Sequence, residues 1–340
     1  MTEILTRETV GWRPHPDRFL HILDNPLHRL VVDLQDLSTR ATTDFWSARG
    51  ARCLHLPITT NSISSPMGLG SDSQPVSVDM FGQRTYLADS MQFMLEYGCR
   101  LSEAGAWYLM PSFRGEDADS THLNQFFHSE AEIPGGLDDV MRVSEEYVRD
   151  LARRALTELA DELRAVVGDL SHIEHMATTD PFVRLTFDEA VSLLGDDPAA
   201  VVTHAQGWRT LTRHGEHRLL REVSPFVWVS HYDHLSVPFY QAYAAGGQRS
   251  ALNADLLFGP GEVIGCGERH VGGEDTLRAL EHHQVPPEDY DWYVRMKAES
   301  PMHTAGFGMG VERWLMWMLK QPDIRELQLV PRLNGVSLMP

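Results

Sequence analysis

The amino-acid sequence predicts a fold that mixes helices and strands, and three patterns support this class. Residues 28–57 indicate a helix and then a strand, because apolar residues recur at three- and four-residue steps before a stretch that ends at Pro57. Residues 106–133 contain two extended runs. Residues 138–167 keep the apolar spacing of a long amphipathic helix until Gly168. The chain of 340 residues is long enough to bury a large core.

The composition favours a cytoplasmic protein that binds neither DNA nor membranes. Cys53, Cys99 and Cys266 are far apart and show no metal-ligand spacing, which indicates reduced thiols and no structural zinc site. No stretch approaches the roughly 18 apolar residues of a membrane span, and the charged N-terminus does not resemble a signal peptide. The 48 acidic and 29 basic residues give a net charge of −19 without a basic tail, which disfavours tRNA as a partner.

No repeat or linker divides the chain. We therefore expect an N-terminal extension over residues 1–27 and one catalytic domain over residues 28–340, with a helical insertion at about 135–250. Within that insertion, the Thr-Phe-Asp-Glu pattern from Thr186 predicts a capped helix that ends at Leu194. Residues 58–78 are rich in Ser, Gly and Pro. This composition is equally consistent with a loop that covers a site and with a plain connection.

The extended runs within 106–133 gather polar side chains on one face. In the second run, the strand period of two places four residues on that face: Phe126, His128, Glu130 and Glu132. By the same rule, Arg114 and Glu116 share a face of the first run. An antiparallel pair would then present an arginine, carboxylates and a stacking ring together, as a nucleoside triphosphate site needs. A solvated polar sheet face explains the spacing equally well.

Two later segments add charged residues beside glycines. Asp255 and Glu262 lie across a Gly-Pro-Gly turn, so two adjoining strands would aim both carboxylates at one hard cation such as Mg²⁺. In residues 305–319, three glycines at every second position precede a helix with Arg313 in its first turn. A basic group there is electrostatically unfavourable, because the N-terminal end of the helix dipole is positive, so its presence suggests that it binds a ligand. The glycine spacing is not that of a Rossmann fold, and no P-loop lysine is present.

In this order, the segments resemble the three motifs of the class II aminoacyl-tRNA synthetases, and most closely the catalytic domain of the asparaginyl-tRNA synthetases. The resemblance covers roughly residues 28–332 and includes FRGE at 113–116, EAE at 130–132 and GFGMGVER at 306–313. The segments YLADSMQ at 86–92 and GEVIG at 261–265 also match. The resemblance implies an antiparallel sheet of about six strands flanked by helices, and a homodimer paired through the helix and strand of 28–57.

The same resemblance implies a role for each matching residue in binding ATP. Arg114 would bind the α-phosphate and the substrate carboxylate, and Glu116 would help to fix ATP. Phe126 and Arg313 would sandwich the adenine, while Asp255 and Glu262 would hold Mg²⁺. These roles imply ATP and Mg²⁺ as cofactors, with an acyl adenylate and pyrophosphate as products.

The resemblance also implies how an amino acid would be chosen. Arg269 would meet its side-chain oxygen, Glu96 stands as in the asparagine-specific enzymes, and Leu95 replaces the lysine of the aspartate-specific ones. One arginine and one glutamate suit an amide, which favours asparagine over aspartate. Ser90 and Gln92 match positions that contact the amino acid backbone.

Three departures from the family pattern suggest a changed function. Only some 27 residues precede the first motif, where the family carries an anticodon-binding barrel, so anticodon reading is not expected. Thr121 replaces an arginine before His-Leu. The stretch 64–70 replaces the acid that relatives use for the α-amine, a role that would pass to Asp72 or Glu130.

The interpretation we favour is a stand-alone ligase that activates an asparagine- or aspartate-like amino acid and transfers it to a nitrogen nucleophile, either ammonia or a small amine. One alternative is aminoacylation of tRNA without an anticodon domain, and another is a non-catalytic amino acid sensor. Among the remaining residues, Cys266 is expected to be a packing residue. Two interpretations of His231 and His234 are metal ligation and a structural role beside a strand at Pro238–Tyr240, and we favour the structural role. His282 and His283 are expected to lie on an exposed helix.

Overall fold

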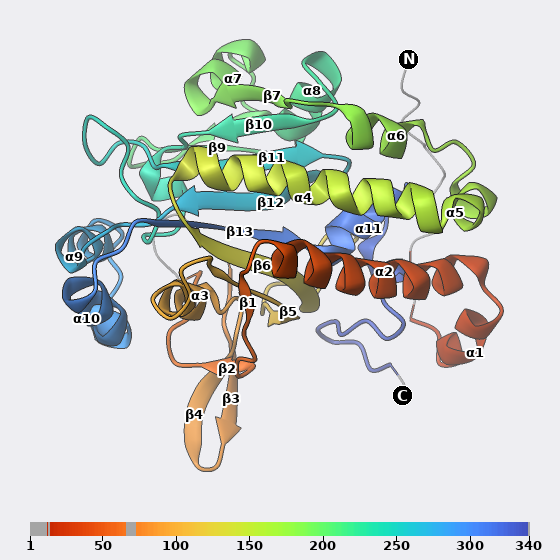
Figure 1. The fold of residues 1–340 in the computed structure, drawn as a ribbon, viewed down its shortest axis with the longest axis horizontal. Helices are drawn as coiled ribbons and strands as arrows, with labels where there is room; N and C mark the ends of the chain where they lie inside the picture. The colour runs from red at the N-terminus through yellow and green to blue at the C-terminus, as the bar shows by residue number, and fades with distance from the viewer. Residues whose placement is uncertain (1–11, 13, 66–72, 339–340) are drawn as a thin grey trace.

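A computed structural model describes residues 12, 14–65 and 73–338 (Figure 1). In these residues an eight-stranded sheet forms the centre of the fold. Its order is β1 (Arg52–Cys53), β5 (Ala106–Phe113), β6 (Gln125–Pro134), β13 (Thr304–Gly310), β12 (Gly261–Glu268), β11 (Asn253–Phe258), β10 (Val227–Ser230) and β7 (Val183–Thr186). In this order, the strands from β5 to β10 pair with one another in antiparallel fashion. At the two edges, β1 pairs with β5 and β7 pairs with β10 in parallel. The predicted antiparallel sheet flanked by helices is confirmed.

Two long helices cover one face of this sheet: α2 (Pro26–Ala48) and α4 (Leu137–Glu158) run across its front in Figure 1. Trp46 of α2 stacks on Phe307 of β13 with 6.0 Å between ring centroids. The Tyr147 hydroxyl of α4 lies 2.8 Å from the Ser129 hydroxyl of β6. Each buried apolar side chain on this face stabilises the fold by about 1.5–3 kcal/mol, so this layer forms the main core.

Helix α2 begins two residues before the predicted segment because Asn25 caps it and Pro26 occupies its first position. The Asn25 side chain accepts a hydrogen bond from the Leu27 N–H. The predicted apolar positions are buried: Leu30, Leu34, Leu37, Ala41 and Phe45. The following strand is shorter than predicted, since β1 pairs with only two residues of β5. After Leu54 donates to the Trp107 carbonyl, the chain leaves the sheet edge.

The predicted helix over 138–167 forms as α4 and α5 (Ala160–Val167), which are separated at Leu159. The capped helix predicted from Thr186 is confirmed as α7 (Phe187–Leu194), with Thr186 as its N-cap. The segment 135–250 also contains α6 (Ser171–Thr178), α8 (Arg213–Glu222) and the hairpin β8 (Val201–Thr203) and β9 (Arg209–Leu211).

That segment is not only helical, as the sequence had suggested, because β7 and β10 join the main sheet. The residues of β10 are all buried, so the strand lacks the alternation that would have revealed it.

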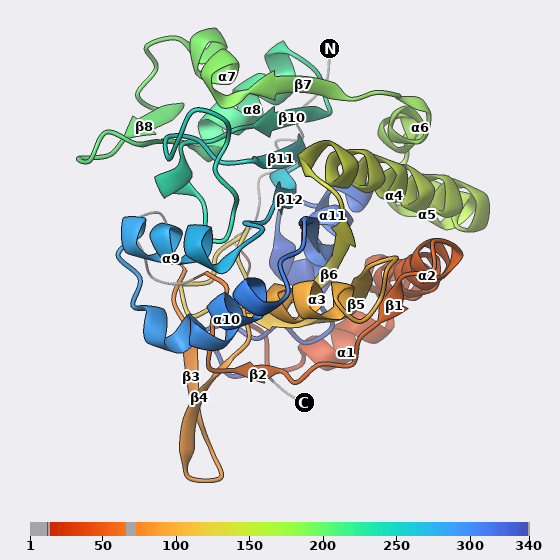
Figure 2. The same cartoon turned by 60° about the vertical axis from the view of Figure 1, so that its left-hand side comes forward.

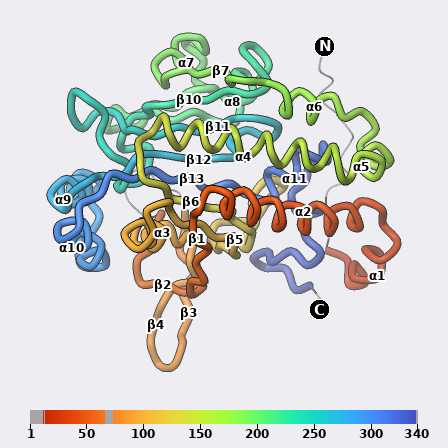
Figure 3. Tube along the Cα trace, viewed as in Figure 1, coloured from red at the N-terminus to blue at the C-terminus, as the bar shows by residue number. Residues whose placement is uncertain are grey.

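The remaining elements surround the sheet (Figures 2 and 3). A small sheet of β2 (Thr59–Thr60), β4 (Gln83–Leu87) and β3 (Val76–Met80) extends away from the body as a hairpin. The other helices are α1 (Arg18–Leu23), α3 (Gln92–Cys99), α9 (Gly273–His282), α10 (Asp291–Glu299), α11 (Val311–Leu319) and the short η1 (His234–Ser236), η2 (Pro287–Tyr290) and η3 (Ile324–Leu327). Helix α1 lies within the predicted extension, and Arg18 pairs with Glu326 of η3 at 3.1 Å. None of the helices in the described part of the chain has the length and apolar content to cross a membrane.

Candidate active site

The candidate site lies on the sheet face that α2 and α4 leave uncovered. Strand β6 places Glu130 and Glu132 opposite Gly308 and Gly306 of β13. A Cβ atom at position 306 would clash with the carboxylate of Glu132 and lie 2.8 Å from Nη2 of Arg269. Glycine is therefore required here so that these two side chains can lie flat on the strand. The prediction that Glu130 and Glu132 share one face of β6 is confirmed.

Arg114 and Glu116 do not extend a strand as predicted, because β5 ends at Phe113. They lie in the following loop, which Asn124 holds by donating its side-chain amide to the carbonyls of Arg114 at 2.9 Å and Glu116 at 2.7 Å. The carboxylate of Glu116 accepts from the Gln74 N–H at 3.1 Å. The loop thus has a fixed shape even though the strand pairing does not reach it.

A pocket of about 160 Å³ opens beside this loop. Its lining includes the predicted ATP-binding residues Arg114, Glu116, Phe126, Glu262 and Arg313. The guanidinium carbon of Arg114 lies 5.4 Å from the centre of the Phe126 ring. Arg114 Nε is buried, and no hydrogen-bond acceptor in the described part of the chain reaches it. A buried donor without an acceptor is costly, which indicates that a ligand completes this site.

Arg313 occupies the first turn of α11, as predicted, and reaches across to β12. Its Nη1 donates to the Glu262 carbonyl at 2.9 Å and lies 3.7 Å from the Glu262 carboxylate. The side chain is 28% exposed, so the guanidinium stays accessible from the pocket while its position is fixed. Its place at a helix N-terminus is electrostatically unfavourable, and the carboxylate of Glu262 compensates for this.

Asp255 and Glu262 converge as their turn spacing predicts. A Cβ atom at position 265 would lie 3.1 Å from Glu262 Oε1 and 3.6 Å from Asp255 Oδ1. A third carboxylate, Glu216 of α8, accepts from the Glu262 N–H at 3.2 Å. Sequence reasoning missed Glu216 because nothing in its spacing connects α8 to the β11–β12 turn.

The three carboxylates carry more negative charge than Arg313 alone balances. Burial and then the charges of Glu262 and Glu216 hold the pKa of Asp255 well above its ordinary value. Burial and the Glu262 charge raise the pKa of Glu216 to about 7. Hard divalent cations prefer such carboxylate oxygens, so the donor set fits Mg²⁺.

Replacing Glu216 with glutamine is expected to stabilise the magnesium-free protein at alkaline pH. Because the pKa of Glu216 is raised to about 7, the folded protein binds more protons than the unfolded chain below that pH. Its stability therefore falls as pH rises from the ordinary glutamate pKa to 7. The variant should gain about 1–3 kcal/mol over the wild type at pH 8 and little at pH 5 in urea unfolding.

The matched control is Glu222→Gln in the same helix. Hydrogen bonding by Arg218 lowers the pKa of Glu222, so its loss should destabilise the protein at pH 8. A Glu216→Gln effect that is equal at both pH values would contradict the proposed titration.

The predicted amine-binding region centres on Glu130. Its carboxylate accepts from the Ser90 hydroxyl at 2.6 Å and from the Tyr108 hydroxyl, and lies 2.9 Å from His128 Nδ1. Burial alone would raise the pKa of Glu130, but the His128 charge and these hydrogen bonds outweigh it and lower the pKa. Glu130 is therefore an anion at neutral pH. Asp72, the other predicted partner of the amine, lies outside the described residues.

The predicted backbone-binding residues lie next to Glu130. Ser90 also accepts from the Gln92 N–H at 3.1 Å, which holds the start of α3 against the site. The Gln92 side-chain nitrogen is buried, and its hydrogen-bonding neighbour is the Tyr240 hydroxyl. Because an amide NH₂ group has two N–H donors, one of them remains available to a ligand.

The predicted side-chain-reading residues, Glu96 and Arg269, already have protein partners. Glu96 pairs with Lys297 of α10 at 2.6 Å, and both side chains are fully buried. Arg269 pairs with Glu132 at 3.0 Å and donates to Gln241 Oε1 at 3.1 Å. These four charged side chains therefore form two buried ion pairs.

The sequence placed Glu132 on the polar face of β6, but it did not predict Lys297, Gln241 and Tyr293 as parts of this network. Burial raises the pKa of Glu132 to about 7, although Arg269 opposes the shift. The Tyr293 hydroxyl donates to Glu96. The only available signal was composition, since the chain has two lysines and one of them is Lys297.

Cys266 behaves as the packing residue that was predicted. It is 3% exposed, and burial together with the Asp255 charge raises the pKa of its thiol. Cys99 is buried as well, whereas Cys53 is exposed. A disulfide reagent should therefore titrate one thiol rapidly in the native protein and three after denaturation. Rapid labelling at Cys266 in an alkylation map would contradict this expectation.

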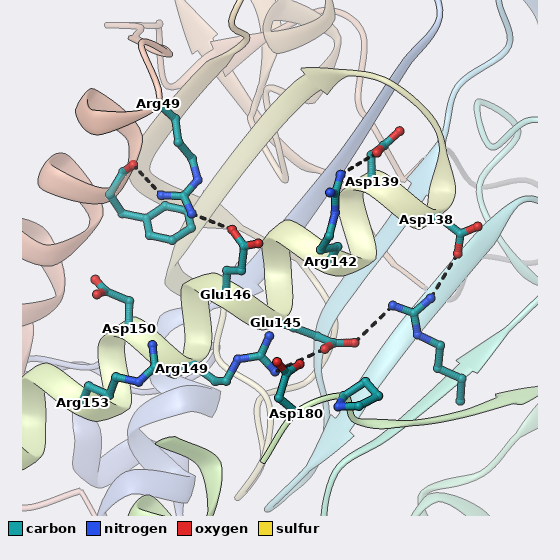
Figure 4. A pocket seen from close by; sticks show the side chains of 13 residues that line it. Arg49, Asp138, Asp139, Arg142, Glu145, Glu146, Arg149, Asp150, Arg153 and Asp180 are labelled. Carbon is teal, nitrogen blue, oxygen red and sulfur yellow. Dashed lines mark hydrogen bonds and ion pairs between the residues drawn. The ribbon is translucent and has the colours of Figure 1, made fainter. Parts of the chain in front are cut away.

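A larger pocket of about 830 Å³ lies beside α4 (Figure 4). Its lining is rich in charge, but the charges neutralise one another. Arg49 pairs with Glu146 at 2.6 Å, Arg142 with Asp139 at 2.7 Å, and Arg149 with Glu145 at 3.3 Å. Four of its five arginines pair with carboxylates, and Arg153 donates to the Ala177 carbonyl at 3.1 Å, so we do not treat this pocket as an anion site.

Comparisons with known proteins identify the family of this chain. A family model, tRNA synthetases class II (D, K and N), matches residues 16–334. An asparagine–tRNA ligase of Koribacter versatilis is 28% identical over 302 residues, which is 87% of this chain and 66% of the relative. Another, of Pyrococcus abyssi, is 32% identical over 258 residues, 74% of this chain and 57% of the relative. This chain thus spans 57% to 66% of the length of these two curated relatives.

Solved structures agree with the sequence comparisons. The crystal structure of asparaginyl-tRNA synthetase from Pyrococcus horikoshii, complexed with asparaginyl-adenylate, has a TM-score of 0.84 and 26% identity. The match covers 95% of this chain and 73% of that one. The resemblance predicted from the motifs is therefore confirmed. Because the family model covers most of its length, the chain belongs to the class II tRNA synthetases of the D, K and N group.

Proposed function

We propose that the protein is an ATP-dependent ligase that activates an asparagine- or aspartate-like amino acid as an acyl adenylate and transfers it to a nitrogen nucleophile. The observation that supports this most directly is the pocket that gathers Arg114, Phe126, Arg313 and Glu262, with a buried Arg114 donor that has no protein acceptor. A guanidinium and an aromatic ring are suited to the phosphate and the adenine of ATP. We therefore propose for these residues the roles that the resemblance implies.

In the proposed reaction, an oxygen of the substrate carboxylate attacks the α-phosphorus of ATP, and pyrophosphate leaves with the electrons of the broken P–O bond. Arg114 binds the α-phosphate and the attacking carboxylate, so that the two reacting atoms meet in line. Arg313 and Phe126 hold the adenine between them. Such a transfer depends on positioning and charge neutralisation more than on acid–base groups.

Asp255 and Glu262 would hold Mg²⁺, with Glu216 beside them. The ion, when bound, neutralises phosphate charge. In the second step, the lone pair of the acceptor nitrogen attacks the acyl carbon, AMP leaves with the electrons of the C–O bond, and the nitrogen loses a proton.

The amino acid would lie between Glu130 and the Arg269 region. The anionic Glu130 suits the substrate ammonium, and the second amide N–H of Gln92, beside the one directed at Tyr240, suits its carboxylate. We propose asparagine or a similar amide as the substrate, read by Arg269 and Glu96. We also propose that two copies of the chain pair through α2 and β1.

A second candidate function is aminoacylation of tRNA, because the curated relatives that match the chain are asparagine–tRNA ligases. The net charge of −19 disfavours a surface that makes many phosphate contacts. Binding of an amino acid for regulation alone is a third candidate, which the complete set of charged residues at the pocket disfavours.

Amino acid-dependent exchange of pyrophosphate into ATP tests the proposal directly. The assay uses the purified chain without tRNA, with the standard amino acids and close analogues of asparagine. Exchange with asparagine or an analogue is expected and would establish adenylation. Adding tRNA and then small amines distinguishes the two acceptor classes by the product formed. Absence of exchange under all these conditions, with ATP still bound, would favour the regulatory function instead.

A further inference from the structure

Three histidines come together at the end of α9, outside the candidate active site. His282 is the last residue of this helix and His283 follows it, while His234 begins η1. One ring nitrogen from each lies within 4.8 Å of the other two. In the described part of the chain, no other group of three or more His, Cys, Asp or Glu side chains meets this criterion.

This arrangement differs from the sequence predictions for these residues. His283 is 3% exposed rather than on an open helix surface, and His234 is fully buried. The predicted strand at Pro238–Tyr240 is a turn. Local spacing did not reveal the cluster, because residues about 50 positions apart form it only after α9 has packed on the loop that follows β10.

Hydrogen bonds fix the form of the His234 ring. Its Nε2 lies 2.8 Å from the Gln241 carbonyl, which only accepts, so Nε2 carries the proton. The lone pair is then on Nδ1, which accepts a hydrogen bond from His283 Nε2–H at 2.8 Å. A bound ion would take the place of this proton, which His283 then carries on Nδ1. A backbone carbonyl that orients a histidine in this way is the usual outer partner of a metal ligand.

The rings are neutral at physiological pH, as ligands must be. Burial, followed by the neighbouring histidines, lowers the pKa of His234 to about 2 and that of His283 to about 3. Burial also lowers the pKa of His282. Neutral imidazoles are the common protein ligands of zinc.

We propose that His234, His282 and His283 form a binding site for one divalent transition-metal ion, with Zn²⁺ as the best match. Zinc accepts three imidazoles at about 2.0–2.1 Å with a fourth position open, which places the ligand nitrogens about 3.4 Å apart. The His234 and His283 nitrogens, now 2.8 Å apart, would separate slightly, and the His282 ring would move towards them. His282 is only partly buried, which gives the ion and a water ligand a way in. Magnesium prefers oxygen ligands and does not suit this donor set.

The site would stabilise the adjacent part of the proposed amino acid pocket. The same Gln241 that orients His234 through its carbonyl accepts from Arg269 through its side chain at 3.1 Å. An ion bridging His234 to α9 would therefore hold the loop that positions Arg269. The metal site itself does not depend on the proposed ligase activity.

The test uses the full chain, treated with a chelator and then titrated with Zn²⁺ in the presence of excess Mg²⁺ to occupy the carboxylates near Glu262. We expect binding of one equivalent and a melting temperature raised by several degrees. His282→Ala should weaken binding by more than about tenfold, since even outer partners of metal ligands are worth 10–100-fold. Cobalt in place of zinc should give visible absorption bands that disappear in this variant.

The matched control is His55→Ala, which removes an exposed histidine elsewhere and should bind zinc like the wild type. His282 is chosen because it is the least buried of the three, so the variant is expected to fold. Zinc affinity that is equal in His282→Ala and the wild type would overturn the proposal, as would the absence of any bound zinc. The cluster would then be a hydrogen-bonded histidine pair only.

Discussion

Replacing Arg313 with alanine is expected to lower ATP-dependent pyrophosphate exchange by about 10²–10³-fold, the usual effect of removing one charged group aimed at a transition state. Arg313 is the cation of α11 at the pocket, and its guanidinium is held by the carbonyl of Glu262 at 2.9 Å. Its loss removes one face of the proposed adenine sandwich and leaves the carboxylates of Glu262, Asp255 and Glu216 without their neighbouring cation. The deficit should therefore appear in both ATP affinity and turnover.

The fold of this variant should be unchanged, because the Arg313 side chain is 28% exposed and no core contact depends on it. Circular dichroism and the melting temperature check this directly. Arg164→Ala removes an exposed arginine of α5, far along the chain, and should exchange pyrophosphate like the wild type. Full activity in a folded Arg313→Ala protein would rule out the proposed adenylation site.

The Arg114→Ala variant is expected to differ from Arg313→Ala in the stability of the ligand-free protein. Its guanidinium stacks near Phe126, and its Nε lacks an acceptor in the described residues. Arg114→Ala thus removes an unsatisfied buried donor, so the ligand-free protein should lose little stability or gain some. Loss of exchange together with an unchanged or higher melting temperature would distinguish a ligand-binding arginine from a structural one.

The parts of the site that could be predicted from the sequence are those that depend on residues close together in the chain. The alternation on β6, the Gly-Pro-Gly turn between Asp255 and Glu262, and the glycines before Arg313 each lie within one segment, so their geometry follows from strand and helix periods. The resemblance to the three family motifs then indicated that these separate segments contribute to one site. Arg114 was predicted to lie on a strand, but β5 ends one residue before it, at Phe113.

The parts that were missed come from tertiary packing. Glu216 reaches Glu262 from a helix 46 positions earlier, and Lys297 reaches Glu96 across 201 positions, which follows from their residue numbers. Neither helix carries a motif, and a buried lysine has the same sequence pattern as an exposed one. The fully buried β10 lacked alternation for a related reason, since burial on both faces removes the period that marks a strand.

Glu96 illustrates how such packing changes an interpretation based on motifs. As a residue that reads an amide, it would have a free carboxylate oxygen for the substrate NH₂ group. In the structure it accepts from Tyr293 and pairs with Lys297 at 2.6 Å, with both charged side chains at 0% exposure. Two roles are therefore open to the same carboxylate: recognition of the substrate and neutralisation of a buried ammonium.

Replacing Glu96 with glutamine is expected to destabilise the protein by about 3–5 kcal/mol, because removal of one partner leaves the buried charge of Lys297 uncompensated. Burial already lowers the pKa of Lys297. Without Glu96 the folded protein binds the Lys297 proton still more weakly than the unfolded chain does, so the deficit should shrink as pH rises. Urea unfolding of the variant between pH 6 and pH 9 measures this trend.

The double variant Glu96→Gln with Lys297→Met separates the two roles of Glu96. Methionine fills similar volume without a charge, so most of the lost stability should return. If Glu96 reads the substrate, as we propose, the preference for asparagine over aspartate in pyrophosphate exchange should fall in both variants, whatever their stability. If stability returns and the preference equals that of the wild type in both, then Glu96 serves only Lys297, and Arg269 alone must distinguish the amide from the acid.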